Sequence, residues 1–339
     1  MDDSPSRMRR ALRSVHRRPF VSLGIVGLSG LLLLNVLAYA HAGAMTSFAR
    51  EGAAPGRIET LSRAQKARAL LLGVTVPRPF NQRTPADLEL EYQALTCTAR
   101  DGTSLETWHV PIEPSRGTVV LFHGYAASKA ALLPEARELH ALGFACLLVD
   151  FRGSGGSAGN ETTLGFHEAQ DVAAAAQLAR SLAPGRPLVL LASSMGAAAV
   201  LRAIHTEGVL PDGLVLEAPF DRLLTTVENR FDRMGAPSFP AAHLLLFWGG
   251  VQRRIDGYSH DPVAYARAVT CPTLLLHGDA DPNVTVPQAR SVFEALATTD
   301  KAFVLLPGVA HEDYLAARPD EWRAAMRRFL RRWSDPHRE

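Results

Sequence analysis

Short apolar runs alternate with longer mixed stretches over the last two-thirds of the chain. The apolar runs predict six strands, at residues 118–122, 144–149, 187–192, 213–218, 273–276 and 302–306. The stretches between them predict helices near residues 130–142, 167–182, 196–207, 287–297 and 319–333. Because strands and helices alternate, the pattern indicates an α/β fold with a mostly parallel sheet and right-handed crossovers.

Two more strands are expected before this alternation begins. Leu88–Thr98 and Ser104–Val110 flank the turn-forming pair Asp101-Gly102 and predict a β-hairpin. The complete prediction is an eight-stranded sheet with helices on both faces. We expect this globular domain to occupy residues 89–335.

One interval, residues 221–272, breaks the alternation. It holds about 50 residues where a short connection would suffice, and it includes the apolar run Leu244–Trp248. Because this segment is so apolar, we expect it to form a helical cap over the strand ends, where the cap would line a substrate pocket. Two alternatives stay open: an additional core helix without substrate contact, and a segment at Leu244–Trp248 that dips into a membrane.

An uncharged segment, Phe20–Ala40, lies near the N-terminus. Its 21 residues are long enough to cross a hydrocarbon core of about 30 Å. Six arginines precede it, and only Arg50 and Glu51 are charged in the fifteen residues that follow. The positive-inside rule then places the N-terminus in the cytoplasm and the globular domain on the other side.

These features predict a basic cytoplasmic tail at 1–18, a transmembrane helix at 19–41 and a juxtamembrane segment at 42–88 with a helix near Ile58–Leu72. A cleaved signal peptide, which would release a secreted protein, is the alternative. Ala38-Tyr39-Ala40 and Ala42-Gly43-Ala44 both match A-x-A cleavage sites. The apolar segment is longer than the usual 7–15 residues of a signal peptide, which favours an uncleaved anchor.

The charge balance changes once the N-terminal segment is set aside. The chain has 36 basic and 34 acidic residues, and residues 1–44 hold six and two of them, which leaves 30 and 32. A nearly neutral domain gives no electrostatic reason to expect a nucleic-acid partner. Three cysteines are too few for a disulfide framework, and no metal-binding motif is present, so we expect no metal and no cofactor.

A candidate nucleophile follows the apolar run at 187–192. Ser194 stands in Ala192-Ser193-Ser194-Met195-Gly196, where a strand would turn sharply into an Ala-rich helix. Small residues two before and two after the serine allow the close packing that a nucleophile elbow G-x-S-x-G needs, although alanine replaces the first glycine. Ser193 is the rival, but its spacing to the glycine does not fit.

An acid and a histidine follow at the ends of the next predicted strands. Asp281 comes after the run 273–276, with Asp279 and Asp221 as rival acids, and His311 comes after 302–306. The order Ser, Asp, His along the chain is that of a hydrolase triad. Upstream, His123-Gly124-Tyr125 ends another strand, and Asp150–Ser157 forms a D-x-R-G-x-G-x-S turn that we interpret as structural.

Residues from about 90 to 333 resemble the α/β-hydrolase superfamily, on its serine-aminopeptidase-like and acyl-ester hydrolase branch. The resemblance implies a catalytic triad of Ser194, Asp281 and His311. It also implies an oxyanion hole formed by the backbone N–H groups of Tyr125 and Met195.

The expected activity is therefore hydrolysis of a carboxylic ester through an acyl-enzyme, on a small-molecule or lipid-like acyl substrate. A thioesterase or an amidase/peptidase using the same triad is the first alternative. A non-catalytic binding domain with a hydrolase fold is the second, and the complete triad argues against it.

Overall fold

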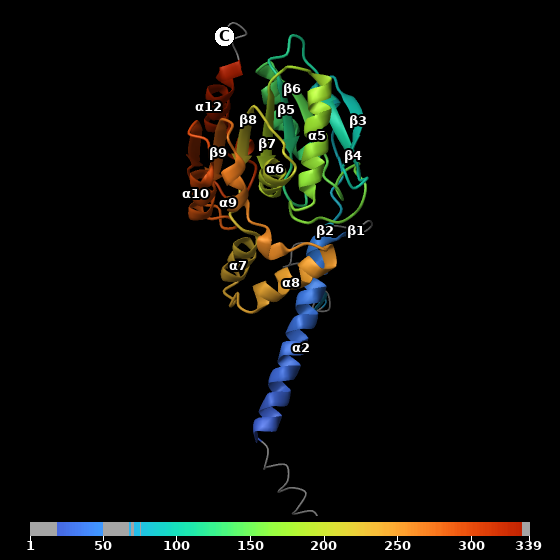
Figure 1. Cartoon of the computed structure of the whole chain (residues 1–339), viewed down its shortest axis with the longest axis vertical. Coiled ribbons are helices and arrows are strands. Elements are labelled where there is room, and N and C mark those ends of the chain that lie inside the picture. The colour runs from blue at the N-terminus through green and yellow to red at the C-terminus, as the bar shows by residue number, and fades with distance from the viewer. Residues whose placement is uncertain (1–18, 50–67, 69–70, 75, 334–339) are drawn as a thin grey trace, which may run out of the picture.

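The computed structural model describes residues 19–49, 68, 71–74 and 76–333, with side chains from residue 23 onward. The basic tail expected at 1–18 lies outside the described residues. So does most of the helix expected near Ile58–Leu72. Within the described residues, a long N-terminal helix leads to a layered α/β body (Figure 1).

The body is built around one sheet that contains eight strands of the described chain, in the order β10-β9-β8-β7-β5-β6-β4-β3. β3 pairs antiparallel with β4, β4 pairs antiparallel with β6, and the other pairs are parallel. The strands are β3 (Gln93–Thr98), β4 (Ser104–Val110), β5 (Thr118–Phe122), β6 (Ala145–Val149), β7 (Leu188–Ser193), β8 (Gly213–Glu217), β9 (Thr273–Gly278) and β10 (Lys301–Leu306).

Helices cover both faces of this sheet, and each face buries its own apolar core. One face carries α5 (Glu168–Leu182), α6 (Met195–Thr206), α9 (Pro262–Tyr265) and α10 (Val286–Ala295). The other carries α4 (Leu133–Ala141), α11 (Tyr314–Ala317) and α12 (Pro319–Leu330). The central strands β5, β6 and β8 are buried along their whole length, as expected for parallel strands covered on both faces.

The α/β-hydrolase fold and the eight-stranded sheet predicted from the sequence are confirmed. The largest difference in a strand is at the first one, which begins at Gln93 and not at Leu88. Residues Pro85–Leu88 form a 3₁₀ turn, because Thr84 and Asp87 make a capping box that fixes the chain there.

The N-terminal helix α2 runs from Pro19 to Thr46, five residues beyond the end expected for the span. Its segment Leu23–Thr46 is long and apolar enough to cross a membrane, and an 18-residue window within it has a mean hydropathy of 2.0. A signal sequence would satisfy the same criterion. The helix continues past residue 41 because its last turns pack on α8, with the small side chains of Ala38 and Ala42 buried.

The insertion between β8 and β9 divides into two parts. The helices α7 (Leu223–Arg233) and α8 (Ala241–Arg253) lie apart from the sheet, between the body and α2 (Figure 1). The remainder returns to the body, where Tyr265, Ala266 and Val269 join the core beside α6. Of the segment 221–272 expected to form a cap, α7 and α8 are therefore the part that lies away from the sheet.

The end of α2 is fixed to the body by specific contacts. The Tyr125 hydroxyl donates to the Met45 carbonyl oxygen at 2.6 Å. Arg253 of α8 donates to the Thr46 hydroxyl at 2.8 Å and also pairs with Glu161 of the body at 2.6 Å. The short strand β1 (Phe48–Ala49) pairs with β2 (Val76–Pro77). The apolar helix thus meets the body at the side where the cap lies.

Candidate active site

Ser194 lies at the turn between β7 and α6, in a backbone conformation that is rare for a residue with a side chain. Its φ is 52° and its ψ is −112°. Such a turn is strained and holds the hydroxyl clear of the sheet at the start of the helix. Gly196 makes the turn possible, because a Cβ there would lie 2.7 Å from the Phe122 carbonyl oxygen.

The structure brings Ser194, His311 and Asp281 together from three separate loops. His311 Nε2 lies 2.9 Å from Ser194 Oγ, and His311 Nδ1 lies 2.6 Å from Asp281 Oδ2. Asp281 follows β9, and His311 follows β10. Parallel neighbouring strands end at the same edge of the sheet, which is why residues 117 positions apart can meet.

Asp281 is held in place by its own loop. Its Oδ1 accepts hydrogen bonds from the backbone N–H groups of Asn283 and Val284, at 2.8 and 3.0 Å, and its Oδ2 is left to face His311. Burial by itself raises the pKa of this carboxyl, but the hydrogen bond and charge of His311 and the two backbone N–H groups outweigh it. The pKa of Asp281 therefore lies below its usual range, and the group stays ionised near neutral pH.

The rival acids are engaged elsewhere. Asp221 accepts from the Thr225 hydroxyl at 2.6 Å and from the Gln288 amide at 3.1 Å. Asp279 accepts from the Gly308 N–H at 2.6 Å on an exposed loop. Neither carboxyl is bonded to His311. Ser193 ends β7 and pairs in register with Glu217, so its backbone is part of the sheet and not of the turn.

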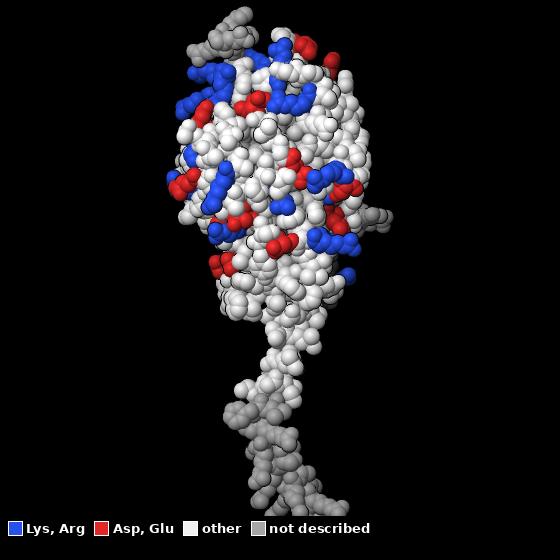
Figure 2. All heavy atoms as spheres, viewed as in Figure 1, with Lys and Arg blue, Asp and Glu red and all other residues white. Residues whose placement is uncertain are grey.

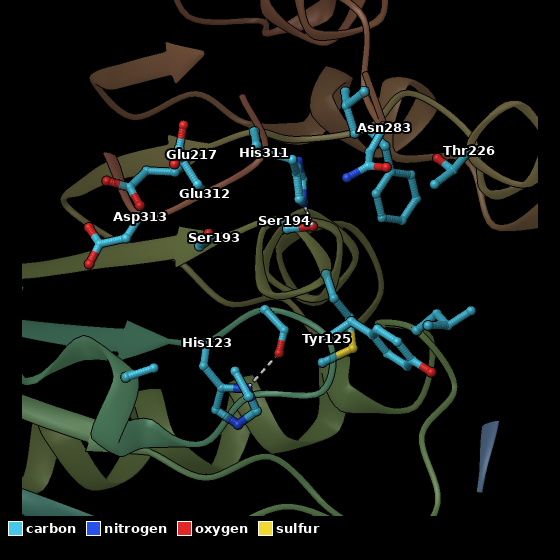
Figure 3. Close-up of a pocket in the computed structure, with 18 of the residues that line it drawn as sticks. His123, Tyr125, Ser193, Ser194, Glu217, Thr226, Asn283, His311, Glu312 and Asp313 are labelled. Atoms are coloured by element: carbon cyan, nitrogen blue, oxygen red, sulfur yellow. Dashed lines mark hydrogen bonds between the residues drawn. The ribbon is translucent and has the colours of Figure 1, made fainter. Parts of the chain in front are cut away.

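The residues expected to supply the oxyanion hole flank the serine. Met195 is the first residue of α6, and Tyr125 follows the buried His123 and the half-buried Gly124 after the end of β5. Figure 3 shows Ser194 between His311 and Tyr125. His123 Nδ1 lies 2.8 Å from the Gly124 carbonyl oxygen, and its Nε2 accepts from the Phe151 N–H at 3.2 Å. Both ring nitrogens of His123 therefore contact backbone groups, and the imidazole orients this loop.

The Asp150–Ser157 turn is a structural network. Asp150 is fully buried and pairs with the equally buried Lys129. Arg152 forms a salt bridge to Asp171 at 2.6 Å. These charges satisfy one another beneath the loop that carries Tyr125, as the sequence interpretation supposed.

A cavity of about 470 Å³ opens beside Ser194 and His311. Its apolar wall comes from the cap helix α7, through Leu223 and Val227, and from Met45 at the end of α2. Asn283 and Thr226 lie at this end in Figure 3, and Arg230 of α7 also lines it. The expected cap is thus part of the pocket, but through α7; the lining includes no residue of α8.

Four carboxyl groups that the sequence pattern did not single out also line the cavity. Glu135 belongs to α4, Glu217 ends β8, and Glu312 and Asp313 follow His311, on the other side of Ser194 from Asn283 and Thr226 in Figure 3. Burial raises the pKa of Glu217 to about 7, although Trp322 Nε1 donates to it at 2.7 Å. Burial and the neighbouring carboxyls of Glu217 and Asp313 also raise the pKa of Glu135. In the sequence, the feature that could have indicated these carboxyls is Glu217, because it ends an otherwise apolar strand.

Comparison with known proteins agrees with this architecture. The family model for serine aminopeptidases, S33, matches residues 113–262. The uncharacterised protein YfhR of Salmonella typhimurium is 29% identical over 257 residues, which cover 73% of this chain and 82% of that protein. A monoacylglycerol lipase of Mycolicibacterium smegmatis is 25% identical over 238 residues, covering 61% of this chain and 85% of the lipase.

The solved structures that resemble this one share its fold. The Pyrococcus furiosus esterase Pf2001 superposes with a TM-score of 0.65 at 24% identity, over 76% of this chain and 97% of the esterase. An esterase from Exiguobacterium antarcticum superposes with a TM-score of 0.54 at 19% identity, over 70% of this chain and the whole of the esterase. The match to part of the chain, the sheet order and the elbow together give the chain an α/β-hydrolase fold.

Proposed function

We propose that this protein is a serine hydrolase that cleaves carboxylic esters and that α2 anchors it in a membrane. The hydrogen-bonded series Ser194, His311, Asp281 is the observation that supports the chemistry. A histidine that contacts both a serine hydroxyl and an ionised carboxyl is arranged to take a proton from the first while the second stabilises its charge.

The reaction proceeds in two halves. Ser194 Oγ attacks the substrate carbonyl carbon while His311 Nε2 takes the hydroxyl proton, and the carbonyl oxygen becomes an oxyanion facing the N–H groups of Tyr125 and Met195. The ester C–O bond breaks, and His311 gives its proton to the departing alkoxide. Water then attacks the acyl-enzyme with His311 as base, which releases the acid and restores Ser194.

The cavity favours an acyl substrate with an apolar portion. Met45, Leu223 and Val227 offer aliphatic surface next to the serine. The esterases and the monoacylglycerol lipase among the similar proteins support an ester as the bond that is cleaved. A thioester would fit the same groups. This mechanism calls for no cofactor.

A second candidate function is hydrolysis of an amide or peptide with a free amino group. The observation that favours it is the set of carboxyls in the other part of the cavity, Glu135, Glu217, Glu312 and Asp313. Burial raises the pKa of Glu135 and Glu217, and an ammonium group beside them would favour their ionised form and pair with it. A panel of acyl esters, acyl thioesters and aminoacyl amides separates the two. Faster turnover of the aminoacyl amides would favour the second candidate.

Labelling with a fluorophosphonate tests whether Ser194 is the nucleophile. It also separates a serine hydrolase, which should be labelled, from a non-catalytic binding domain, which should not. We expect the full chain to be labelled, Ser193→Ala to be labelled at a similar rate, and Ser194→Ala to be unlabelled, because only Ser194 Oγ contacts His311. Thermal unfolding of each variant controls for folding. Labelling that survives Ser194→Ala, or that is absent from the wild-type chain, would refute the proposal.

A further inference from the structure

The cap helix α8 contacts the part of α2 that would lie inside a membrane. Trp248 Nε1 donates to Asn35 Oδ1 at 3.2 Å, and the Trp248 ring packs edge-on against Tyr39, with centroids 5.4 Å apart. Gln252 Nε2 donates to the Tyr39 carbonyl oxygen at 2.8 Å. These contacts fix where α8 lies along α2.

The length of α2 indicates how deep in a bilayer this contact would lie. At 1.5 Å per residue, the twenty residues from Phe20 to Tyr39 span about 30 Å, the thickness of a hydrocarbon core. Large apolar side chains are exposed along this stretch, from Leu23 at 71% to Tyr39 at 52%. If α2 crosses a membrane, Trp248 lies at the boundary between hydrocarbon and head groups, where tryptophan is enriched.

The outer side of α8 continues the apolar surface. His243, Phe247 and Val251 recur at intervals of four along α8 and share one side of the helix. The rings of Phe239, just before the helix, and of Tyr258 both contact His243, and we call these five residues the cap stripe. Phe239 is 72% exposed, and Phe247, Val251 and Tyr258 are also exposed. Figure 2 shows that the end of the body from which α2 emerges is almost entirely uncharged in that view.

Basic side chains flank the cap stripe. Arg230 and Arg233 at the end of α7 and Arg254 just after α8 are exposed. Long basic side chains beside an apolar surface can reach lipid phosphates while their aliphatic stems stay in the apolar layer. An exposed apolar row next to a spanning helix, with arginines at its margins, fits a lipid surface better than water.

We propose that the cap stripe rests in the interfacial layer of a lipid bilayer, on the same side as the globular domain. This proposal depends on the anchoring role of α2 proposed above. It places the catalytic cavity at the membrane surface, since Met45, which lines that cavity, lies about 9 Å along α2 beyond Tyr39. Substrate with an apolar acyl chain then enters from the lipid and passes the α7 wall to reach Ser194.

Depth-dependent fluorescence quenching tests this placement with the full chain in phosphatidylcholine and phosphatidylglycerol vesicles. Single cysteines replace Phe239 or Phe247 in a Cys97→Ser, Cys271→Ser background, in which the fully buried Cys146 is retained. The matched control is Leu210→Cys, 77% exposed on the loop that enters β8, at the opposite end of the sheet from Ser194. Each variant, checked for cooperative unfolding, carries one polarity-sensitive fluorophore.

We expect labels at 239 and 247 to be quenched by lipids with a nitroxide on the upper acyl chain. Quenching by aqueous iodide should be about tenfold weaker there than at 210, because an interfacial residue is largely removed from water. Equal iodide quenching at all three sites would overturn the proposal. Protection from both quenchers would overturn it too, since a second copy or another protein would then cover the stripe.

Failure of the proposed chemistry is detected separately in the same vesicles. Fluorophosphonate labelling of the wild-type chain reports on Ser194 regardless of where the cap lies. Release of the chain by alkaline carbonate would refute anchoring by α2 and, with it, the interfacial position of the cap. A chain that stays bound, labels with the probe and leaves position 239 open to iodide would refute only the inference drawn here.

Discussion

At the scale of single residues, the proposed catalysis rests on one strained turn and on the hydrogen bonds around it. Ser194 keeps its positive φ because Gly196 allows α6 to approach the end of β5 closely. Asp281 keeps its orientation because two backbone N–H groups hold one oxygen and leave the other for His311. Removing the charge of Asp281 should therefore affect catalysis far more than removing neighbouring charges.

Asp281→Asn should lower kcat by about 10⁴-fold, the cost of losing the acid in the serine-protease triad. The asparagine would favour the wrong tautomer of His311 and could not stabilise its charged form. Asp221→Asn and Asp279→Asn are the controls, because both carboxyls are bonded elsewhere and should leave kcat within a few-fold of wild type. Hydrolysis of a chromogenic acyl ester provides the measurement. Wild-type activity of Asp281→Asn would assign the acid to another residue.

At the scale of elements, strands and helices are joined through a few buried polar groups. Glu217 at the end of β8 accepts a hydrogen bond from Trp322 of α12, and both side chains are buried. The carboxyl is protonated more readily in the folded chain than in water, since burial raises its pKa from 4.5 to about 7. Folding therefore takes up a proton at this site between those two pH values, which makes stability depend on pH.

Glu217 should contribute stability fully below pH 4.5 and lose that contribution as pH rises to about 7, because ionisation of a buried carboxyl opposes folding. In Glu217→Gln, whose amide oxygen can still accept from Trp322, we expect a weaker fall in Tm over this range than in wild type. Thermal unfolding of the full chain in detergent at a series of pH values measures the difference. The exposed Asp279→Asn is the control. Parallel curves for wild type and Glu217→Gln would contradict the assignment.

At the scale of the whole molecule, the apolar helix and the hydrolase body form one unit. α2 lies against α8, its last turn lines the cavity through Met45, and the Tyr125 hydroxyl binds the Met45 carbonyl. Cleavage after Ala40 or Ala44 would leave Met45 in the domain but would remove most of the helix that packs against α8, including Asn35, the partner of Trp248. This arrangement favours an anchor that stays attached to the domain.

Topology can be tested in intact cells. The six arginines before the span and the near absence of charge after it predict a cytoplasmic N-terminus and a catalytic domain on the opposite side. Protease added to spheroplasts should digest residues 45–339 and spare an N-terminal tag. The mass of recovered protein should equal that of the full chain, because cleavage after Ala40 or Ala44 would remove the tail and span. Protection of the domain, while an external control is digested, would reverse the orientation.

The sequence by itself determined the α/β-hydrolase fold and the residues that the fold brings together. Apolar runs of strand length, a serine between small residues, and an acid and a histidine after later strands are local signals. In a parallel sheet the carboxyl ends of all strands lie at one edge, so residues that directly follow different strands lie near one another. The first strand was assigned too early, because the local capping box at Thr84 competes with strand pairing.

Only the tertiary structure decided which side chains share the cavity and where the cap lies. Glu135 and Asp313 are 178 residues apart in the chain, and no periodicity links them. The contact between Trp248 and Asn35 spans 213 residues, so the sequence could suggest that Leu244–Trp248 approaches a membrane but could not choose between that, a core helix and a cap. Such contacts depend on how separate helices pack, a property of the whole folded chain that no single segment contains.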